Sequence, residues 1–355
     1  MIYILICIGL IIALVLEYFV YLFCAFYRIP DNQILEIDRA SDRRNVPIGK
    51  NLSIMTYNIG FAAYLDDFSF FMDGGKYSRA YSEDSVKKDL KNISRVIEHN
   101  PADFMFIQEV DLDATRSYHV NEQKELLESL DSVDCTSAID YDSPYLFYPI
   151  SKPHGKSLSS LLTASKYCIR NAVRRSLTIQ DGVAKFLDLD RCFSCNWIDT
   201  EDGKELCLIH FHLSAYATDP SISDSQLIEL YEVMKQERQK GNYVIAGGDF
   251  NKDLLGDSSK FFVSDGRKHA KTTPFPFEIL PKDFELLYPY DKKKPIATCR
   301  NSHEPYKENS TYVQTIDGFI VSDNIDALNI YVVDTGFKYS DHNPVILDFA
   351  LKTGV

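Results

Sequence analysis

The chain begins with one long apolar segment. From Met1 to Tyr27 the only charged residue is Glu17, and Ile, Leu, Val and Phe dominate. About 20 apolar residues in a helix cross a bilayer, so residues 1–27 predict a single transmembrane anchor. The alternative is a cleaved signal peptide, which typically has a basic start and ends in small residues. No Lys or Arg precedes this segment and it ends in Cys24-Ala25-Phe26-Tyr27, which favours an uncleaved anchor.

After the anchor, short apolar runs alternate with amphipathic stretches. Residues 28–50 are mostly polar and predict a tether, and residues 51–355 predict one large domain. Apolar residues at helical spacing predict helices over 82–99 and 224–240. Short apolar runs predict strands over 52–57, 103–107, 206–213, 243–246, 311–321 and 345–351. This alternation indicates an α/β fold.

A helix, a strand and an acid follow one another twice along the chain. The first such series ends at Glu109 and the second at Asp249. The repetition predicts two similar halves whose acids meet at one site.

The composition fits a globular domain that does not depend on a basic face. The 355 residues are 45% apolar and 25% charged, and the net charge is −13. Proteins that hold long nucleic acids usually present basic surfaces, so the charge argues against such a partner. A small phosphorylated substrate stays open, because a bound metal ion can supply positive charge.

The eight cysteines predict free thiols in a domain too large to need disulfides. Cys192 and Cys195 form a lone C-x-x-C with no second pair at zinc-binding spacing. Arg28, Arg39, Arg43 and Arg44 follow the apolar segment, whereas no basic residue precedes it. The positive-inside rule and the thiols together predict a cytoplasmic domain on a single-pass membrane protein.

Three motifs in the first part of the domain place polar side chains at strand ends. Asn58 ends Thr-Tyr-Asn-Ile, and Glu109 lies in Phe-Ile-Gln-Glu-Val. A carboxylate directly after a buried strand is costly unless it is paired or bound to a metal, and Mg²⁺ prefers such oxygens. In His210-Phe-His212-Leu both imidazoles share one face, and His212 is the candidate for the site because it is nearer the strand end. Taken singly, Asn58 is better explained as a turn residue, and a surface ion pair explains Glu109 as well as a metal does. For the two histidines, one buried structural residue and one site residue is favoured over a zinc pair.

Three further motifs carry acids, amides and an imidazole. In Gly-Gly-Asp249-Phe-Asn251 the glycines permit a tight turn that projects both polar side chains together. Asp317 lies within an apolar strand and therefore needs a partner. Ser-Asp341-His342-Asn-Pro-Val supplies an imidazole that the Asp317 carboxylate could hold in one tautomer.

Taken in order, the six motifs resemble those of the endonuclease/exonuclease/phosphatase superfamily. It includes DNase I-like nucleases, exonuclease III-like repair enzymes, inositol polyphosphate phosphatases and neutral sphingomyelinases. The resemblance covers residues 51–351, and Gly-Asp-Phe-Asn and Ser-Asp-His-x-Pro-Val are its most specific parts. It implies a four-layer αββα sandwich.

The resemblance also implies a role for each motif residue. A Mg²⁺ ion, or Mn²⁺ in its place, would be held by Glu109 with Asn58 beside it and Asp341 as a further metal-side carboxylate. Asp249 would activate water, and His342, oriented by Asp317, would act as acid/base or phosphate contact. Asn58, Asn251 and His212 would contact the phosphoryl group. Exonuclease III-like members carry an acid where this chain has Gly60.

Family resemblance predicts hydrolysis of a phosphoester but leaves the substrate open. The anchor favours a membrane phospholipid headgroup, and nucleic acid is the alternative. A membrane-bound module that binds phosphorylated ligands without catalysis is a third interpretation, although Glu109, Asp249 and His342 are all present. A monomer is expected.

Two basic clusters could face an anionic lipid or a polyphosphate, although solvated surface charge is the favoured interpretation. One polar stretch could shape substrate choice or be an ordered surface loop. The clusters are Lys166, Arg170, Arg174 and Arg175, then Lys292 to Lys294, and the polar stretch is Arg116, Tyr118, His119 and Asn121.

Overall fold

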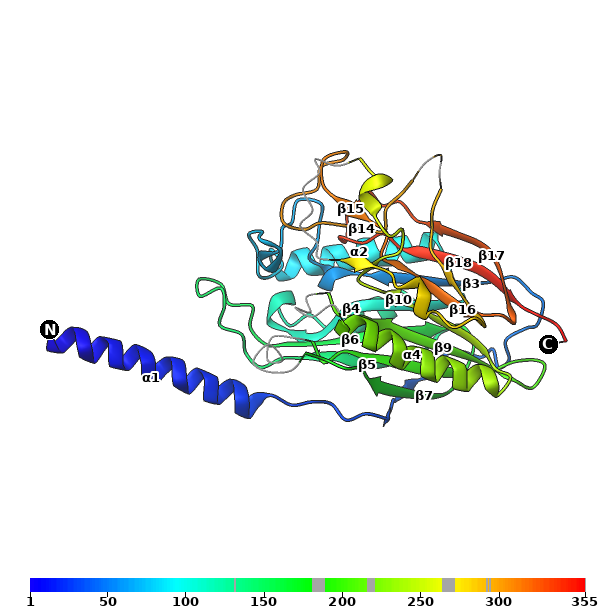
Figure 1. Cartoon of the computed structure of the whole chain (residues 1–355), viewed down its shortest axis with the longest axis horizontal. Helices are drawn as coiled ribbons and strands as arrows, with labels where there is room; N and C mark the ends of the chain where they lie inside the picture. The colour runs from blue at the N-terminus through cyan, green and yellow to red at the C-terminus, as the bar shows by residue number, and fades with distance from the viewer. Residues whose placement is uncertain are drawn as a thin grey trace.

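The structure, a computed structural model, describes residues 1–130, 132–180, 189–215, 221–263, 272–291, 293 and 295–354. Two seven-stranded sheets lie face to face, with helices on their outer surfaces (Figure 1). This is the predicted αββα sandwich. An apolar helix precedes it.

The first sheet has the order β17-β18-β3-β4-β6-β5-β2. Its strands are β17 (Ile325–Val332), β18 (Val345–Leu351), β3 (Leu52–Asn58), β4 (Phe104–Ala114), β6 (Ser157–Ser165), β5 (Asp134–Asp142) and β2 (Ile37–Asp38). The second has the order β1-β7-β8-β9-β10-β16-β13. Its strands are β1 (Gln33–Ile34), β7 (Ile169–Ser176), β8 (Cys192–Asp199), β9 (Glu205–His212), β10 (Tyr243–Asp249), β16 (Asp317–Ser322) and β13 (Phe284–Leu287).

Four α-helices and two small ladders complete the described part of the chain. The helices are α1 (Ile2–Ala25), α2 (Glu83–His99), α3 (Glu122–Leu127) and α4 (Ser221–Gln239). One ladder joins β11 (Lys252–Asp253) to β12 (Thr273–Pro274), and the other joins β14 (Cys299–Arg300) to β15 (Val313–Gln314).

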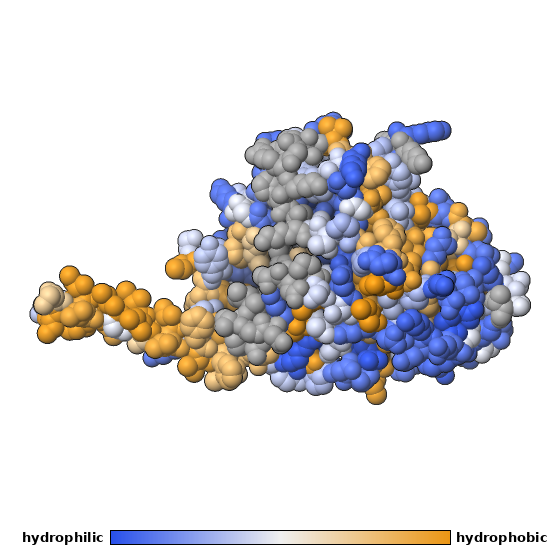
Figure 2. Space-filling view, viewed as in Figure 1, coloured by the Kyte–Doolittle hydropathy of each residue, from blue (hydrophilic) through white to orange (hydrophobic). Residues whose placement is uncertain are grey.

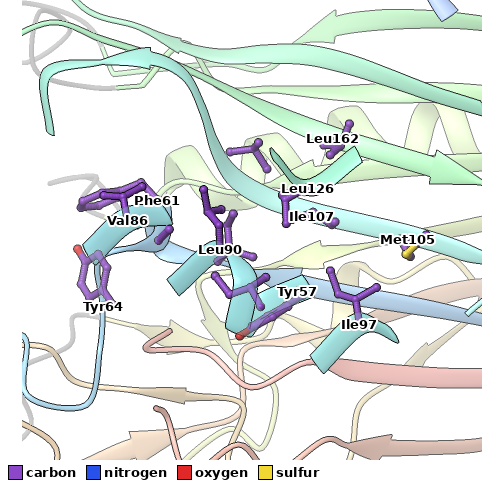
Figure 3. Packing of buried hydrophobic residues seen from close by; sticks show 14 of the residues in the cluster. Tyr57, Phe61, Tyr64, Val86, Leu90, Ile97, Met105, Ile107, Leu126 and Leu162 are labelled. Carbon is purple, nitrogen blue, oxygen red and sulfur yellow. The ribbon is translucent and has the colours of Figure 1, made fainter. Parts of the chain in front are cut away.

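Three apolar layers hold the sandwich together, as the period-two pattern of the strands requires. In β3, Met55 and Tyr57 face α2, whereas Ile54 packs between the two sheets. Figure 3 shows Tyr57 near Leu90 and Ile97 of α2. The third layer lies between the second sheet and α4.

Both predicted long helices form and connect parallel strands. In α2, Ser82 and Ser85 make a reciprocal capping box, and the apolar positions at helical spacing face the sheet. β3 and β4 are parallel and flank α2 in sequence, and β9 and β10 flank α4 in the same way. The predicted repetition of helix, strand and acid therefore corresponds to two β-α-β units, one in each sheet.

Residues 28–50 follow the domain closely. β1 pairs with β7 and β2 pairs with β5, so this segment adds an edge strand to each sheet. Leu35 and Val46 are buried. The expected tether is thus packed against the domain, and its strands of two residues are too short to give a periodic sequence signal.

α1 projects from one end of the domain (Figure 1). Its 24 residues have a mean hydropathy of 2.6 in the most apolar window, and none of that window is buried. Figure 2 shows apolar colour along the helix. Length and composition therefore suffice to cross a membrane, as they would for a signal sequence.

Several finer expectations changed in the folded chain. The predicted strand 311–321 is split into β15 and β16, and the strand 103–107 continues to Ala114 through an irregularity after Ile107. By contrast, the prediction of free thiols is confirmed for Cys192 and Cys195, which are buried on β8. Lys292 and Lys294 lie outside the described residues.

The basic cluster on β7 does not form a free cationic surface. Arg174 is fully buried and donates to the carbonyl oxygens of Ile139 and Asp190. Arg170 pairs with Glu205, and Arg175 pairs with Asp31. Because these arginines are buried or paired with acids, the arrangement does not favour the alternative of an anion-binding surface.

Candidate active site

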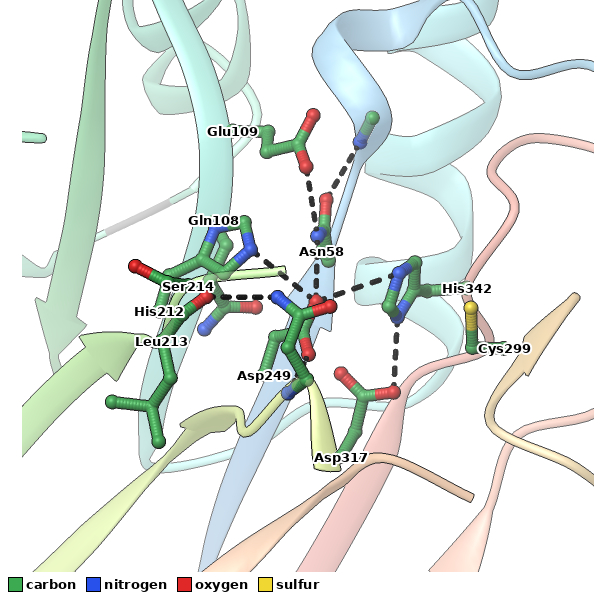
Figure 4. A network of polar contacts seen from close by, with 12 residues as sticks. Asn58, Gln108, Glu109, His212, Leu213, Ser214, Asp249, Cys299, Asp317 and His342 are labelled. Atoms are coloured by element: carbon green, nitrogen blue, oxygen red, sulfur yellow. Dashed lines mark hydrogen bonds and ion pairs between the residues drawn. The ribbon is translucent and has the colours of Figure 1, made fainter. Parts of the chain in front are cut away.

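Four strands bring polar side chains to one edge of the sandwich. β3 and β4 are parallel in one sheet, and β9 and β10 are parallel in the other. β3, β9 and β10 end at Asn58, His212 and Asp249, whereas Glu109 lies at the irregularity within β4. Asn58, Glu109, His212 and Asp249 come together there (Figure 4).

The Asp249 carboxylate is the centre of this cluster. Its Oδ2 lies 3.2 Å from Asn58 Nδ2, 3.4 Å from His212 Nε2 and 3.6 Å from His342 Nε2. The backbone N–H of Asn251 donates to Oδ1 at 2.8 Å. Burial raises the pKa of Asp249 to about 7, because the charged form loses its water.

Asn58 connects the two sheets through a single nitrogen. Its Nδ2 donates to Glu109 Oε1 at 3.1 Å and to Asp249 Oδ2 at 3.2 Å. Its Oδ1 accepts the backbone N–H of Gly60 at 3.0 Å. Because carboxylates need donors and the N–H needs an acceptor, these contacts determine which way the amide faces.

His342 and Asp317 form a buried ion pair beside Asp249. His342 Nδ1 donates to Asp317 Oδ2 at 2.9 Å, as the sequence predicted. Burial opposes the charged imidazole, but Asp317, Cys299 and Asp249 together raise the pKa of His342 well above its ordinary value. Nε2 therefore carries a proton and points towards the centre of the site.

The two histidines of β9 have different environments. His210 Nε2 lies 2.6 Å from Gln108 Nε2, and its ring stacks on Phe106 with centroids 4.6 Å apart. It is a buried structural residue. Burial also lowers the pKa of His212 well below the ordinary value, so a neutral imidazole faces Asp249.

Asp140, on β5, was not anticipated from the sequence. Its Oδ2 lies 4.0 Å from His212 Nδ1, and it has no hydrogen-bond partner among the described residues. Burial raises its pKa to about 6. An acid within the short run Ala138-Ile139-Asp140-Tyr141 was the signal in the sequence that could have identified it.

Two site residues adopt a strained backbone. Glu109 has φ 57° and Asn251 has φ 48°, values that non-glycine residues rarely adopt. Such strain persists where surrounding contacts enforce it and is common at functional sites. At Gly248, with φ 147°, a Cβ would lie 1.9 Å from the Phe211 carbonyl oxygen, so only glycine allows β10 to approach β9 this closely.

Asn251 and Asp341 lie at the margin of the cluster. Asn251 Nδ2 donates to the Leu213 carbonyl oxygen at 2.9 Å. Burial raises the pKa of Asp341 to about 6. A Cβ placed on Gly60 would lie 3.2 Å from Asp341 Oδ1 and 2.7 Å from the Tyr64 ring. There is therefore little room at position 60 for the acid that exonuclease III-like members carry there.

The polar loop after Glu109 is part of the scaffold. The buried Arg116 donates to Asp111 from Nε and Nη2, and its guanidinium lies 4.0 Å from the centre of the Phe61 ring. His119 pairs with Asp113, and Asn121 caps α3. These contacts favour the reading of an ordered loop.

The cluster has the chemistry of a divalent-metal site. One ligand atom each from Asp249, Asp317 and His342 lies within 4.8 Å of the others. Asp317 Oδ1 is buried without a hydrogen-bond partner in the described residues, which fits an additional cation. Glu109, partly exposed, and Asn58 offer a second set of oxygen ligands at the outer side.

A model of the Endonuclease/Exonuclease/phosphatase family matches residues 55–342. Among solved structures, an endonuclease/exonuclease/phosphatase from Beutenbergia cavernae DSM 12333 is 15% identical, with a TM-score of 0.56 over 85% of this chain and 72% of that one. ANGEL2, a 2',3'-cyclic phosphatase in complex with adenosine-2',3'-vanadate, is 16% identical, with a TM-score of 0.56 over 90% and 99%. The human Nocturnin catalytic domain with bound sulfate is also 16% identical, with a TM-score of 0.51 over 90% and 97%. No curated protein matches the sequence.

Proposed function

The chain belongs to the endonuclease/exonuclease/phosphatase family, and we propose that it is a membrane-anchored, magnesium-dependent phosphoesterase that cleaves a phospholipid headgroup with activated water. The observation that carries this proposal is the convergence of an amide and two imidazoles on Asp249 Oδ2. A single carboxylate oxygen so surrounded is suited to accept a proton from an attacking water.

Asp249 is the proposed general base. A pKa of about 7 keeps a large share of the carboxylate ionised at neutral pH while leaving it basic enough to take a proton. Asn58 and Asn251 each donate a hydrogen bond to the carboxylate and so orient it.

The metal is proposed to lie on the Glu109 side, held by Glu109 and Asn58 with Asp341 nearby. His342 Nδ1 is already bonded to Asp317, so we assign proton transfer to the inner cluster and the metal to the outer set of oxygens. A bound Mg²⁺, or Mn²⁺ in its place, would polarise the phosphoryl group and neutralise its charge.

The remaining polar groups are proposed to contact the phosphoryl group. His342, kept protonated by Asp317, donates from Nε2 to a phosphoryl or leaving-group oxygen. His212 supplies a neutral imidazole, and the second N–H of the Asn251 amide is available to the substrate. Donors fixed before the reaction stabilise the charge that develops in the transition state.

α1 supports a lipid substrate, because an anchor would hold the site beside a bilayer. The arginines that follow it support a single-pass protein with a cytoplasmic domain, which we propose is a monomer. Nucleic acid is the second candidate, since the similar ANGEL2 structure contains a nucleotide analogue. The net charge of −13 counts against a long polyanion.

A substrate panel tests the proposal. The full chain, in detergent micelles with Mg²⁺, is assayed on sphingomyelin, phosphatidylcholine, phosphoinositides and supercoiled DNA, with Asp249→Asn as the control. Headgroup release that is lost on chelation and in the variant supports the proposal, whereas nicking of DNA alone selects the second candidate. Silence on every substrate combined with tight phosphate binding would identify a binding module.

A further inference from the structure

The loop between β5 and β6, residues 143–156, exposes apolar side chains with no role in the site. Phe147 is 54% exposed, Tyr148 71% and Ile150 88%. We call these three residues the apolar tip. Figure 1 shows the loop, in green, projecting from the same end of the domain as α1. Three large apolar side chains exposed within four residues usually mark a contact surface.

The loop is in direct contact with the last turns of α1. Tyr18 Oη donates to the Tyr145 carbonyl oxygen at 3.3 Å, and Tyr145 N donates to Tyr21 Oη at 2.9 Å. The rings of Tyr18 and Phe147 meet edge to face, with centroids 5.3 Å apart. The apolar tip is therefore continuous with the apolar surface of the helix.

The length of α1 sets the depth at which this contact lies. A hydrocarbon core of about 30 Å takes about 20 helical residues at 1.5 Å each. In a helix of 24 residues, Tyr18 and Tyr21 then fall near the boundary with the headgroups, where tyrosines concentrate in membrane proteins. The apolar tip, packed beside them, lies at the same depth.

The other features of the loop suit a headgroup region. Lys152 and Lys156 are exposed in the same loop and can pair with lipid phosphates. The returning arm of the loop is bonded to the domain, since Ser78 Oγ donates to the Lys152 carbonyl oxygen and the Ser78 carbonyl oxygen accepts from His154 Nδ1. A preformed loop loses little conformational freedom on binding.

We propose that the apolar tip inserts into the interfacial zone of the bilayer beside α1 and makes a second membrane contact. This inference rests on the proposed role of α1 as an anchor. β6 begins at Ser157, paired with Ala114, which is the last residue of β4 and lies five positions beyond Glu109. The loop therefore extends past the edge that carries the site, and its insertion turns that edge towards lipid headgroups.

Fluorescence quenching tests the depth of the loop. The natural chain has one tryptophan, Trp197, whose emission gives the baseline. Full-length Phe147→Trp is reconstituted in phosphatidylcholine–phosphatidylserine vesicles with or without brominated acyl chains. Emission from the added tryptophan should shift to the blue and be quenched by bromine. Leu328→Trp, at a position 49% exposed on β17, is the matched control and should show neither effect. Equal responses at both positions would overturn the proposal.

A second variant tests the consequence for turnover. Phe147→Ser/Tyr148→Ser/Ile150→Ser should lower headgroup release from vesicles by about tenfold, while hydrolysis of soluble bis(p-nitrophenyl) phosphate stays unchanged. Ile228→Ser/Leu328→Ser, which removes apolar surface elsewhere, should leave both rates unchanged. Quenching does not depend on activity. A chain that hydrolyses no lipid but shows quenching at position 147 would therefore contradict the proposed lipid substrate and still support insertion of the apolar tip. Equal vesicle rates for the two variants would reject the docking contact alone.

Discussion

The unit β3-α2-β4 and the unit β9-α4-β10 have the same architecture but place their acids in different surroundings. Glu109 follows Gln108, the residue opposite Asn58 in the β3–β4 ladder, and is partly exposed. Asp249 lies opposite His212 in the β9–β10 ladder, is 1% exposed and is surrounded by hydrogen-bond donors. In the proposed mechanism, the first unit thus presents an accessible oxygen ligand, and the second presents a buried base. Repetition of a fold has not repeated the chemistry.

Neither unit holds a complete site. Asn58 belongs to the first sheet, yet its Nδ2 bonds the acids of both. The functional difference between the acids depends on burial, so substitutions that change charge without changing shape should separate their roles.

Asp249→Asn should give the largest effect, a loss of about 10³-fold in kcat, because the amide cannot accept the proton of the attacking water. Raising the Mg²⁺ concentration should not restore activity. The measurement is kcat as a function of Mg²⁺ on the substrate that the panel identifies. Recovery at high Mg²⁺ would show that Asp249 serves the metal, as Glu109 is proposed to do.

Asp317→Asn should reduce kcat by about 100-fold and change its pH dependence. Asp317 is the largest of the charges that raise the pKa of His342, so without it the imidazolium loses its proton at lower pH. The alkaline limb of the pH–rate profile should therefore move to lower pH. An unchanged limb with a reduced rate would assign Asp317 to metal binding instead.

Glu109→Gln should weaken Mg²⁺ binding by about 100-fold, and saturating Mg²⁺ should recover most of the activity. The partly exposed Glu109 carboxylate accepts a hydrogen bond from Asn58 Nδ2. The measurement is activity as a function of Mg²⁺ concentration for Glu109→Gln, compared with the same curve for Asp249→Asn. Curves of the same shape for both variants would abolish the contrast.

The helices of the two units each bury an acid, but the two acids have opposite pKa shifts, and this difference should appear in the free energy of unfolding. Asp89 in α2 has no hydrogen-bond partner in the described residues, and burial raises its pKa well above 3.8. The protonated Asp89 carboxyl stabilises the fold fully below pH 3.8, and this contribution is lost as pH rises through its raised pKa. Asp89→Asn should therefore stabilise the fold by about 1–3 kcal/mol at pH 8 and have little effect near pH 4.

Glu237 in α4 provides the opposite case. Burial opposes its ionisation, but hydrogen bonds from Lys240, Trp197 and Asn242 lower its pKa below 4.5. Glu237→Gln should therefore destabilise the fold by about 1–3 kcal/mol above pH 5, less as pH falls. Urea unfolding across this pH range measures both variants. Shifts of the same sign at pH 8 would contradict the assigned environments.

Periodicity in the sequence was enough to predict an α/β fold and its two similar units, because long apolar patterns identify α2, α4, β3 and β10. The four-layer sandwich was expected from the family resemblance of the six motifs. It could not reveal β1 and β2, whose two residues show no period. The irregularity before Val110 was also hidden, since a glutamate carries no signal for a positive φ.

The pairing of Asp317 with His342 was predicted from chemistry, since an acid in an apolar strand needs a partner. The shared role of Asn58 and the approach of Asp140 to His212 were not predicted. Both depend on how two sheets stack, and residues far apart in sequence reveal this only after folding.

The connection between α1 and the domain sets how far the enzyme can reach. α1 ends at Ala25, and Ile29 is already buried, with its N–H bonded to Asp190 Oδ2 at 2.8 Å. The three residues between them span about 10 Å even when fully extended. With α1 in a bilayer, as we propose, a domain on so short a connection would act in cis: it would reach lipids of its own leaflet by lateral diffusion, and a facing membrane would lie beyond its reach.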